Sequence, residues 1–178
     1  MARKAVKFDM AGHAYRITPM AAREGLDYMG MSEGDIGPIG MLKGLEVETA
    51  DGWVFLDNEA AINANVFDIS GIIPPFQVLC ALHEFVKRHN FGFMHGRKSP
   101  VIPGRFKSAI VPVVCEDVHP TIAALIDSGK ATVHELETIY SVEDAVRMSD
   151  VIVTAGINAA LSHELTAKEA KQAAKSRR

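Results

Sequence analysis

Residues 142–165 place the strongest constraint on the fold, because their apolar and small side chains recur at the spacing of one helix face. Ser141 directly precedes this run, and Asp144 stands three residues after Ser141. This spacing is typical of a capped helix start. The pattern predicts one long helix that ends near Leu165, and Gly156 would allow a second helix to approach closely. The stripe consists of Val142, Ala145, Val146, Ser149, Ile152, Val153, Gly156, Ile157, Ala160 and Leu161.

Two shorter helices are predicted before this long one. The first begins at Asp117 or at His119-Pro120 and ends before Gly129, since glycine suits the left-handed conformation that follows many helices. Residues 132–135 read Thr-Val-His-Glu, a capping box that starts the second. Residues 168–178 carry five positive charges and no large apolar side chain, so they are expected to be a frayed helix or a tail.

The first third of the chain predicts two β-hairpins. Residues 6–17 alternate around a glycine-containing turn, and residues 46–56 alternate around an Asp-Gly pair. Thr18-Pro19 reads as a cap and first residue of a helix that reaches Tyr28. Residues 58–65 are expected to be helical.

A further helix opens at Pro74-Pro75 and closes near His89-Asn90, where Phe91-Gly92-Phe93 breaks its period. Charged side chains occupy the opposite face. The apolar face is expected to consist of Phe76, Leu79, Leu82 or His83, and Val86.

Residues 95–108 interrupt the pattern of regular structure. Two prolines and a glycine exclude a helix there, and the positive charge is the densest within the chain. We expect a flexible connector or a loop that docks on an acidic surface. Its basic residues are Arg97, Lys98, Arg105 and Lys107.

These elements predict a mostly helical α+β protein, with the two hairpins in the N-terminal part and only helices in the C-terminal part. We divide the chain into an N-terminal α+β domain (residues 1–94), a basic Pro/Gly loop or linker (residues 95–115) and a C-terminal helical region with a basic tail (residues 116–178). The length of 178 residues suits one domain or two small ones.

No combination of residues matches a catalytic site. Nucleophilic catalysis needs a Ser, Cys or Thr beside a base and an orienting group. Cys80 and Cys115 lie in apolar runs and are expected to be reduced and buried. His83, His89 and His95 are six residues apart, which separates them around a helix and argues against a shared metal ion. We therefore expect no enzyme activity, cofactor or metal.

Phosphate and nucleic-acid sites are also disfavoured. Residues 37–40 (Gly-Pro-Ile-Gly) lack the strand–helix frame and the Gly-Lys-Ser/Thr ending of a phosphate loop. The helices joined at Tyr140-Ser141 have helix-turn-helix spacing, but the second begins with Glu143-Asp144, which would repel DNA. The net charge of −3 gives no attraction to nucleic acid or to an anionic membrane.

The sequence gives no sign of export or of membrane insertion. The basic residues Arg3 and Lys4 are not followed by an apolar segment of a signal peptide. No run reaches the roughly 18 apolar residues that a membrane-spanning helix needs. We expect the protein to stay in the cytoplasm where it is made.

Three segments resemble tail assembly chaperones of long-tailed bacteriophages, and together they cover about half of the chain. Residues 8–24 (FDMAGHAYRITPMAARE) are similar to the family's opening hairpin with Gly-x-x-Tyr-x-Ile/Val, followed by a helix at Pro/Thr-Ala-Arg-Glu. The helix at 76–89 with Asn-Phe-Gly at 90–92 resembles its central helix. Residues 129–145 are similar to a Leu-x-Tyr-Ser-Leu-Glu-Asp pattern of tail-gene products. The basic loop departs from the short form of the family.

The resemblance implies a protein that coats the tape-measure protein, keeps it soluble before the tail tube polymerises, and recruits tail-tube subunits. It also implies a homo-oligomer located in the host cytoplasm. The candidate binding surfaces are the helix face with Phe76, Leu79, His83 and Val86, the four basic residues of the loop, and the stripe residues Ser149, Ile152 and Gly156.

Two alternatives stay open. The first is a permanent virion subunit, such as a minor tail, baseplate or head–tail connector protein. The second is a small cytoplasmic enzyme or ligand-binding domain, which would need a deep pocket with convergent polar groups. An apolar helical stripe is also more often part of a core than of an interface.

Overall fold

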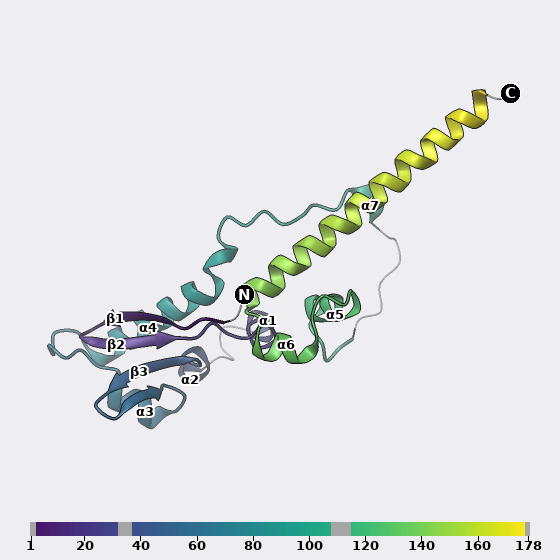
Figure 1. Ribbon diagram of the computed structural model, residues 1–178. Helices are drawn as coiled ribbons and strands as arrows, with labels where there is room; N and C mark the ends of the chain where they lie inside the picture. Colours follow the sequence, from purple (N-terminus) through teal and green to yellow (C-terminus); the bar gives the residue numbers. More distant parts are fainter. Residues whose placement is uncertain (1–2, 32–36, 108–114, 177–178) are drawn as a thin grey trace.

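The computed structural model describes residues 3–31, 37–107 and 115–176 of the chain (Figure 1). The predicted α+β class is confirmed: an antiparallel sheet occupies the N-terminal part, and helix accounts for 57% of the chain. Ser108 and the tail residues Arg177 and Arg178 lie outside the described residues.

Both predicted hairpins are present, and they form one four-stranded sheet. Its order is β1-β2-β3-β4, and every neighbouring pair is antiparallel. Ala11 (φ 52°) and Gly12 (φ 84°) form the turn of the first hairpin; positive φ at both turn positions matches the twist of the flanking strands. The strands are β1 (Val6–Met10), β2 (His13–Ile17), β3 (Leu45–Thr49) and β4 (Gly52–Phe55).

Helix α1 (Ala22–Gly30) begins later than predicted. The predicted start at Pro19 with Thr18 as the cap is wrong, because tertiary contacts hold this segment extended. The Met20 side chain is buried in the core beneath the sheet, and its N–H donates to Asn90 Oδ1 at 2.8 Å. The hydrogen bond to Asn90 of the distant helix α4 and the burial of Met20 therefore decide the conformation of this segment, and the local capping residues do not.

Helices α2 (Pro38–Met41), α3 (Glu59–Asn65) and α4 (Pro75–Phe91) follow the order of the chain. The predicted helix at 58–65 is confirmed, with Asn58 as its cap. Helices α3 and α4 pack with one face of the sheet and enclose a first core. Its buried members are Tyr15, Ile17, Met20, Leu42, Leu45, Val47, Leu56, Ile62, Val66, Val78, Leu82 and Val86.

The C-terminal part is helical, as predicted. It contains α5 (Pro120–Asp127), α6 (Val133–Thr138) and α7 (Val142–Ser176), after two short 3₁₀ turns at Gly92–Met94 and Gly104–Phe106. His119 caps α5, so Asp117 is not its start, and the capping box of α6 is confirmed. Helix α7 runs about three turns beyond the predicted end at Leu165.

Helices α1, α5, α6 and α7 enclose a second core, whose buried members are Ala22, Leu26, Ile122, Leu125, Ala131, Leu136, Val142, Ala145 and Val146. Helix α1 belongs to the predicted N-terminal domain, but its buried residues are part of the second core. A boundary at residue 94 therefore does not separate the two cores. Phe91 packs against both cores, and this contact joins them.

Candidate protein-binding surfaces

The core-facing side of α4 differs from the predicted one. Val78, Leu82, Val86 and Asn90 are the buried residues of this helix. Of the predicted surface residues, Val86 is therefore core, and Leu79 packs partly against the same core. Phe76 is 73% exposed and points away from it.

His83 is half-buried, and its Nε2 has no hydrogen-bond partner among the described residues. Burial lowers the pKa of its imidazole below the ordinary value, so the neutral form is favoured. The predicted burial of both cysteines is wrong, because Cys80 lies on the outer side of α4 and Cys115 is exposed before α5.

A group of exposed apolar side chains lies in the loop between α3 and α4 and at the start of α4. Ile72 is 81% exposed, Phe76 73% and Ile69 62%. Isolated exposed apolar side chains are ordinary, whereas a group within ten residues marks an interaction surface. We call this group the loop patch; it consists of Phe67, Ile69, Ile72, Ile73 and Phe76.

The loop patch stands on a fixed backbone. The Asp68 carboxylate accepts hydrogen bonds from the backbone N–H groups of Ser70, Ile72 and Ile73, at 3.3, 2.9 and 2.9 Å. A hydrogen bond from the Ser70 hydroxyl, together with these backbone bonds, lowers the Asp68 pKa to about 2. The carboxylate therefore stays ionised and holds the loop in one turn at neutral pH.

The first hairpin supports the other side of this loop. The Ile69 N–H donates to the Ala11 carbonyl at 3.1 Å, and the Phe67 ring packs edge-on against His13 with centroids 4.6 Å apart. The loop patch therefore lies at the hairpin end of the sheet (Figure 1). Because its backbone is held on both sides, a partner would dock on it at little entropic cost.

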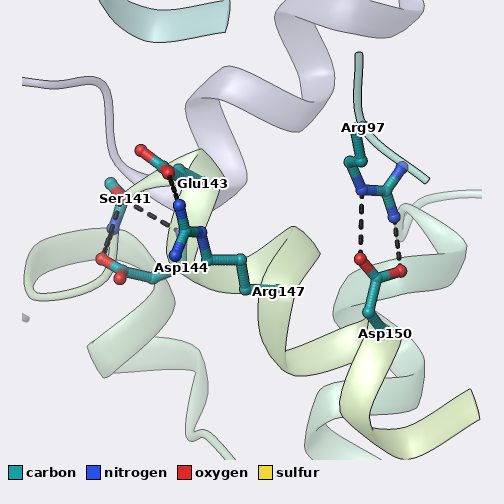
Figure 2. A network of polar contacts seen from close by, with 6 residues as sticks. All are labelled: Arg97, Ser141, Glu143, Asp144, Arg147 and Asp150. Carbon is teal, nitrogen blue, oxygen red and sulfur yellow. Dashed lines mark hydrogen bonds and ion pairs between the residues drawn. The ribbon is translucent and has the colours of Figure 1, made fainter. Parts of the chain in front are cut away.

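The basic loop, which we call the strap (residues 95–107), is fastened to α7. Arg97 Nε donates to Asp150 Oδ2 at 3.1 Å, and Arg97 Nη2 reaches the second carboxylate oxygen (Figure 2). Arg105 Nε lies 3.0 and 3.2 Å from the two oxygens of Glu164. Two of its predicted binding cations are therefore used within the chain, while Lys98 and Lys107 are exposed.

The two ion pairs fasten the strap along about four turns of α7. Arg97 and Arg105 are eight residues apart, and their partners are fourteen residues apart on α7, or about 21 Å of helix. Eight extended residues reach about 26–29 Å. The basic loop therefore contacts two carboxylates of the chain's own longest helix, Asp150 and Glu164.

The first two turns of α7 are packed in the second core, and local hydrogen bonds and an ion pair stabilise them. The Ser141 N–H donates to Asp144 Oδ2 at 3.1 Å, and the Asp144 N–H returns a bond to Ser141 Oγ at 3.2 Å, a reciprocal cap (Figure 2). Arg147 pairs with Glu143 one turn away. Val142, Ala145 and Val146 are buried in the second core, as the stripe predicts.

The rest of α7 projects beyond the body of the protein (Figure 1). We call residues 151–176 the arm. Ser149 and Ile152, two of the predicted binding residues, are half-buried near its base. Gly156 is exposed and a Cβ built there would meet no atom within 4 Å, so the helix predicted to approach it is not among the described residues. Every side chain from Leu165 to Lys175 is exposed.

One line of exposed residues runs along the arm at alternating spacings of three and four. This is the repeat by which one helix packs along another. Val151 is 64% exposed, Leu161 39% and Leu165 59%. We call the line the arm seam; it consists of Val151, Thr154, Asn158, Leu161 and Leu165.

Charge is divided unevenly between the two ends of the molecule. The strap and residues 150–178 together contain nine Lys and Arg against three Asp and Glu. Residues 45–86, which include the loop patch, contain seven Asp and Glu and no Lys or Arg. The near-neutral total therefore conceals a basic end and an acidic end, which the sum of charges alone did not indicate.

Titratable side chains line two grooves of the described surface. A depression of about 460 Å³ lies among α1, α2 and α6, where Arg23 pairs with Glu137 and Lys43 with Glu24, and Asp27 also lines it. Another groove, before the start of α5, is lined by Cys115, Glu116, Asp117 and His119 among others. No group of three His, Cys, Asp or Glu side chains in residues 3–31, 37–107 and 115–176 is placed to hold a metal ion. In the same residues, no helix is both long and apolar enough to cross a bilayer.

The chain matches no protein-family model, no curated protein and no solved structure. Of the predicted binding residues, the structure brings Arg97 and Arg105 onto α7 and leaves Phe76 exposed. It does not join the three predicted surfaces into one. Sequence reasoning missed most of the loop patch, although apolar residues beside an Asp-x-Ser-Gly turn, outside any helical period, were a usable signal.

Proposed function

We propose that this chain is a protein-binding factor of bacteriophage tail morphogenesis, which coats the tape-measure protein and recruits tail-tube subunits. The observation that carries the binding role is the pair of exposed surfaces, the loop patch and the arm seam, which present the large apolar side chains Ile72, Phe76 and Leu165 to solvent. The phage setting comes from the sequence resemblance of residues 8–24, 76–92 and 129–145. The proposed location is the host cytoplasm.

A coat protein needs contacts of two kinds, to its cargo and to neighbouring copies. Both proposed surfaces present apolar groups without a large internal rearrangement, which favours association. The projecting arm suits a helical cargo or a neighbouring copy, because exposed a/d-type residues pack along another helix. Such a role needs no reaction chemistry.

The test is co-expression of the chain with the long helical tape-measure protein, followed by pull-down and by mass spectrometry of purified particles. We expect the wild-type chain to retain the tape-measure protein and to be absent from finished particles. The double variant Ile72→Asp/Phe76→Asp should retain less tape-measure protein in the pull-down than the wild type, because charged side chains replace exposed apolar ones. Val133→Asp is the matched control, since Val133 is exposed at the start of α6, outside both surfaces.

Two outcomes would contradict the proposal. Presence of the chain in particles at fixed stoichiometry would instead identify a permanent virion subunit. Failure of the wild-type chain to retain the tape-measure protein, with the protein folded by circular dichroism, would remove the chaperone role altogether.

A further inference from the structure

We infer that copies of this chain associate head to tail, with the arm of one copy docked on the loop patch of the next. Both surfaces are exposed, and they lie at opposite ends of the molecule (Figure 1). They therefore cannot meet within one chain, and each remains available to a second copy.

Charge complementarity selects a second copy as the occupant. The arm and strap carry seven basic residues against two acidic ones. Glu164 of the arm is paired with Arg105, and Asp150, just before the arm, is paired with Arg97, so the remaining charges of the arm and strap are five lysines and Glu169. Residues 45–86, which include the loop patch, contain seven acidic residues and no Lys or Arg. Glu46 is buried and paired with Arg16, so six acidic residues remain in this segment. The two ends of this one chain are therefore attractive to each other, although the whole chain is only −3.

The apolar parts are also complementary in form. The arm seam is a narrow line on a helix, with Leu161 and Leu165 one turn apart. The loop patch offers two highly exposed large side chains, Ile72 and Phe76. A central apolar contact within a charged rim is the usual anatomy of a protein interface.

The like-with-like alternatives bring equal charges together. Two arms packed side by side in parallel would set Lys168 against its own copy and Glu164 near Glu169. Two loop patches packed face to face would join two segments that contain only acidic charges. Like charges across an interface oppose association, which favours the head-to-tail arrangement over these two, and the mixing experiment below distinguishes it from any pairing of like surfaces.

A head-to-tail contact is heterologous and need not close on itself. It produces a string of copies that grows with concentration, which is the form that a coat on a long partner requires. The inference thus deepens the proposed function. It is nevertheless tested on the purified chain alone, so its failure is separate from a failure to bind the tape-measure protein.

The experiment measures the molar mass of the purified full-length chain by sedimentation velocity and light scattering, up to about 100 µM and at about 50 and 500 mM salt. We expect a mass that rises with concentration at low salt and falls at high salt. The patch variant Ile72→Asp/Phe76→Asp and the arm variant Leu161→Asp/Leu165→Asp should each weaken association by about tenfold or more. Val133→Asp should associate like the wild type.

Mixing the two defective variants is the decisive step. The arm variant keeps its patch and the patch variant keeps its arm, so an equimolar mixture should form dimers and nothing larger. Circular dichroism of each variant confirms that it is folded. A wild-type chain that stays monomeric at low salt, a patch variant that associates normally, or a mixture that stays monomeric while the wild type associates would each overturn the inference.

Discussion

The packing of α1 on α7 predicts that replacement by alanine lowers the free energy of unfolding at one helical glycine and raises it at another. Gly25 lies in α1, and a Cβ added there would stand 2.7 Å from the Val142 Cβ. Contacts under 3.0 Å do not occur between real Cβ atoms, so α1 would have to move by about 1 Å, given an ordinary carbon–carbon separation of about 3.5–4.0 Å. Gly156, in contrast, has open space around its Cβ position.

The magnitudes follow from two terms. Alanine gains about 1 kcal/mol over glycine in a helix interior. Overpacking a closed core costs about 1–3 kcal/mol, and the buried Val142 cannot easily yield. Gly25→Ala should therefore lower the free energy of unfolding by up to about 2 kcal/mol, or Tm by up to about 8 °C. Gly156→Ala should raise it by about 0.5–1 kcal/mol.

Urea unfolding followed by circular dichroism measures both variants. The double variant should equal their sum, because Val142, which Gly25 contacts, and Gly156 are fourteen residues apart on α7, or about 21 Å. If Gly25→Ala stabilised the protein as much as Gly156→Ala does, the contact between α1 and Val142 would be wrong, and with it the assignment of α1 to the second core. If Gly156→Ala were strongly destabilising, a helix would approach the arm there.

Three further predictions concern single side chains. Asn90→Ala should cost about 1–3 kcal/mol in urea unfolding, since it leaves the buried Met20 N–H without its acceptor; an unchanged midpoint would contradict this. The lowered pKa of His83 means that the unfolded state binds its proton first. The contribution of His83 to stability is therefore fully present above about pH 6.5 and declines as the pH falls below it, and His83→Gln should reduce that decline in pH-dependent melting, while His89, whose pKa is also lowered by burial, keeps its own part. Arg105→Gln should speed tryptic cleavage after Lys107 while changing stability by less than about 1 kcal/mol, because the exposed ion pair contributes little; an unchanged cleavage rate would show that the pair does not hold the strap.

The elements predicted best are those whose information is local. The two hairpins, the capping box at Thr132 and the reciprocal cap at Ser141 each depend on residues within a few positions of one another. The buried start of α7 was also predicted, since Val142, Ala145 and Val146 repeat at helical spacing. These features can be predicted without knowing which distant residues pack against them.

The rest depends on partners far away in sequence. Phe76 and Val78 are only two residues apart, and the sequence does not say which lies on the core side of α4. Asn90 is buried because it accepts a bond from Met20, seventy residues earlier. Arg97 binds a carboxylate that comes fifty-three residues later. Charged and amide groups at such separations have no periodic pattern, so their pairing follows only from the folded arrangement.

The assignment of α1 to the second core has a consequence for the order in which the chain is synthesised. Residues 22–30 leave the ribosome between two strands of the sheet, yet the helices that cover Leu26 include α7, whose buried residues end at Val146. The first core can close once α4 has emerged, while the apolar side of α1 must wait for more than a hundred further residues, at least five seconds at about 5–20 residues per second. During that interval the nascent chain carries one finished core and one uncovered helix, which is the period when it most needs protection from aggregation.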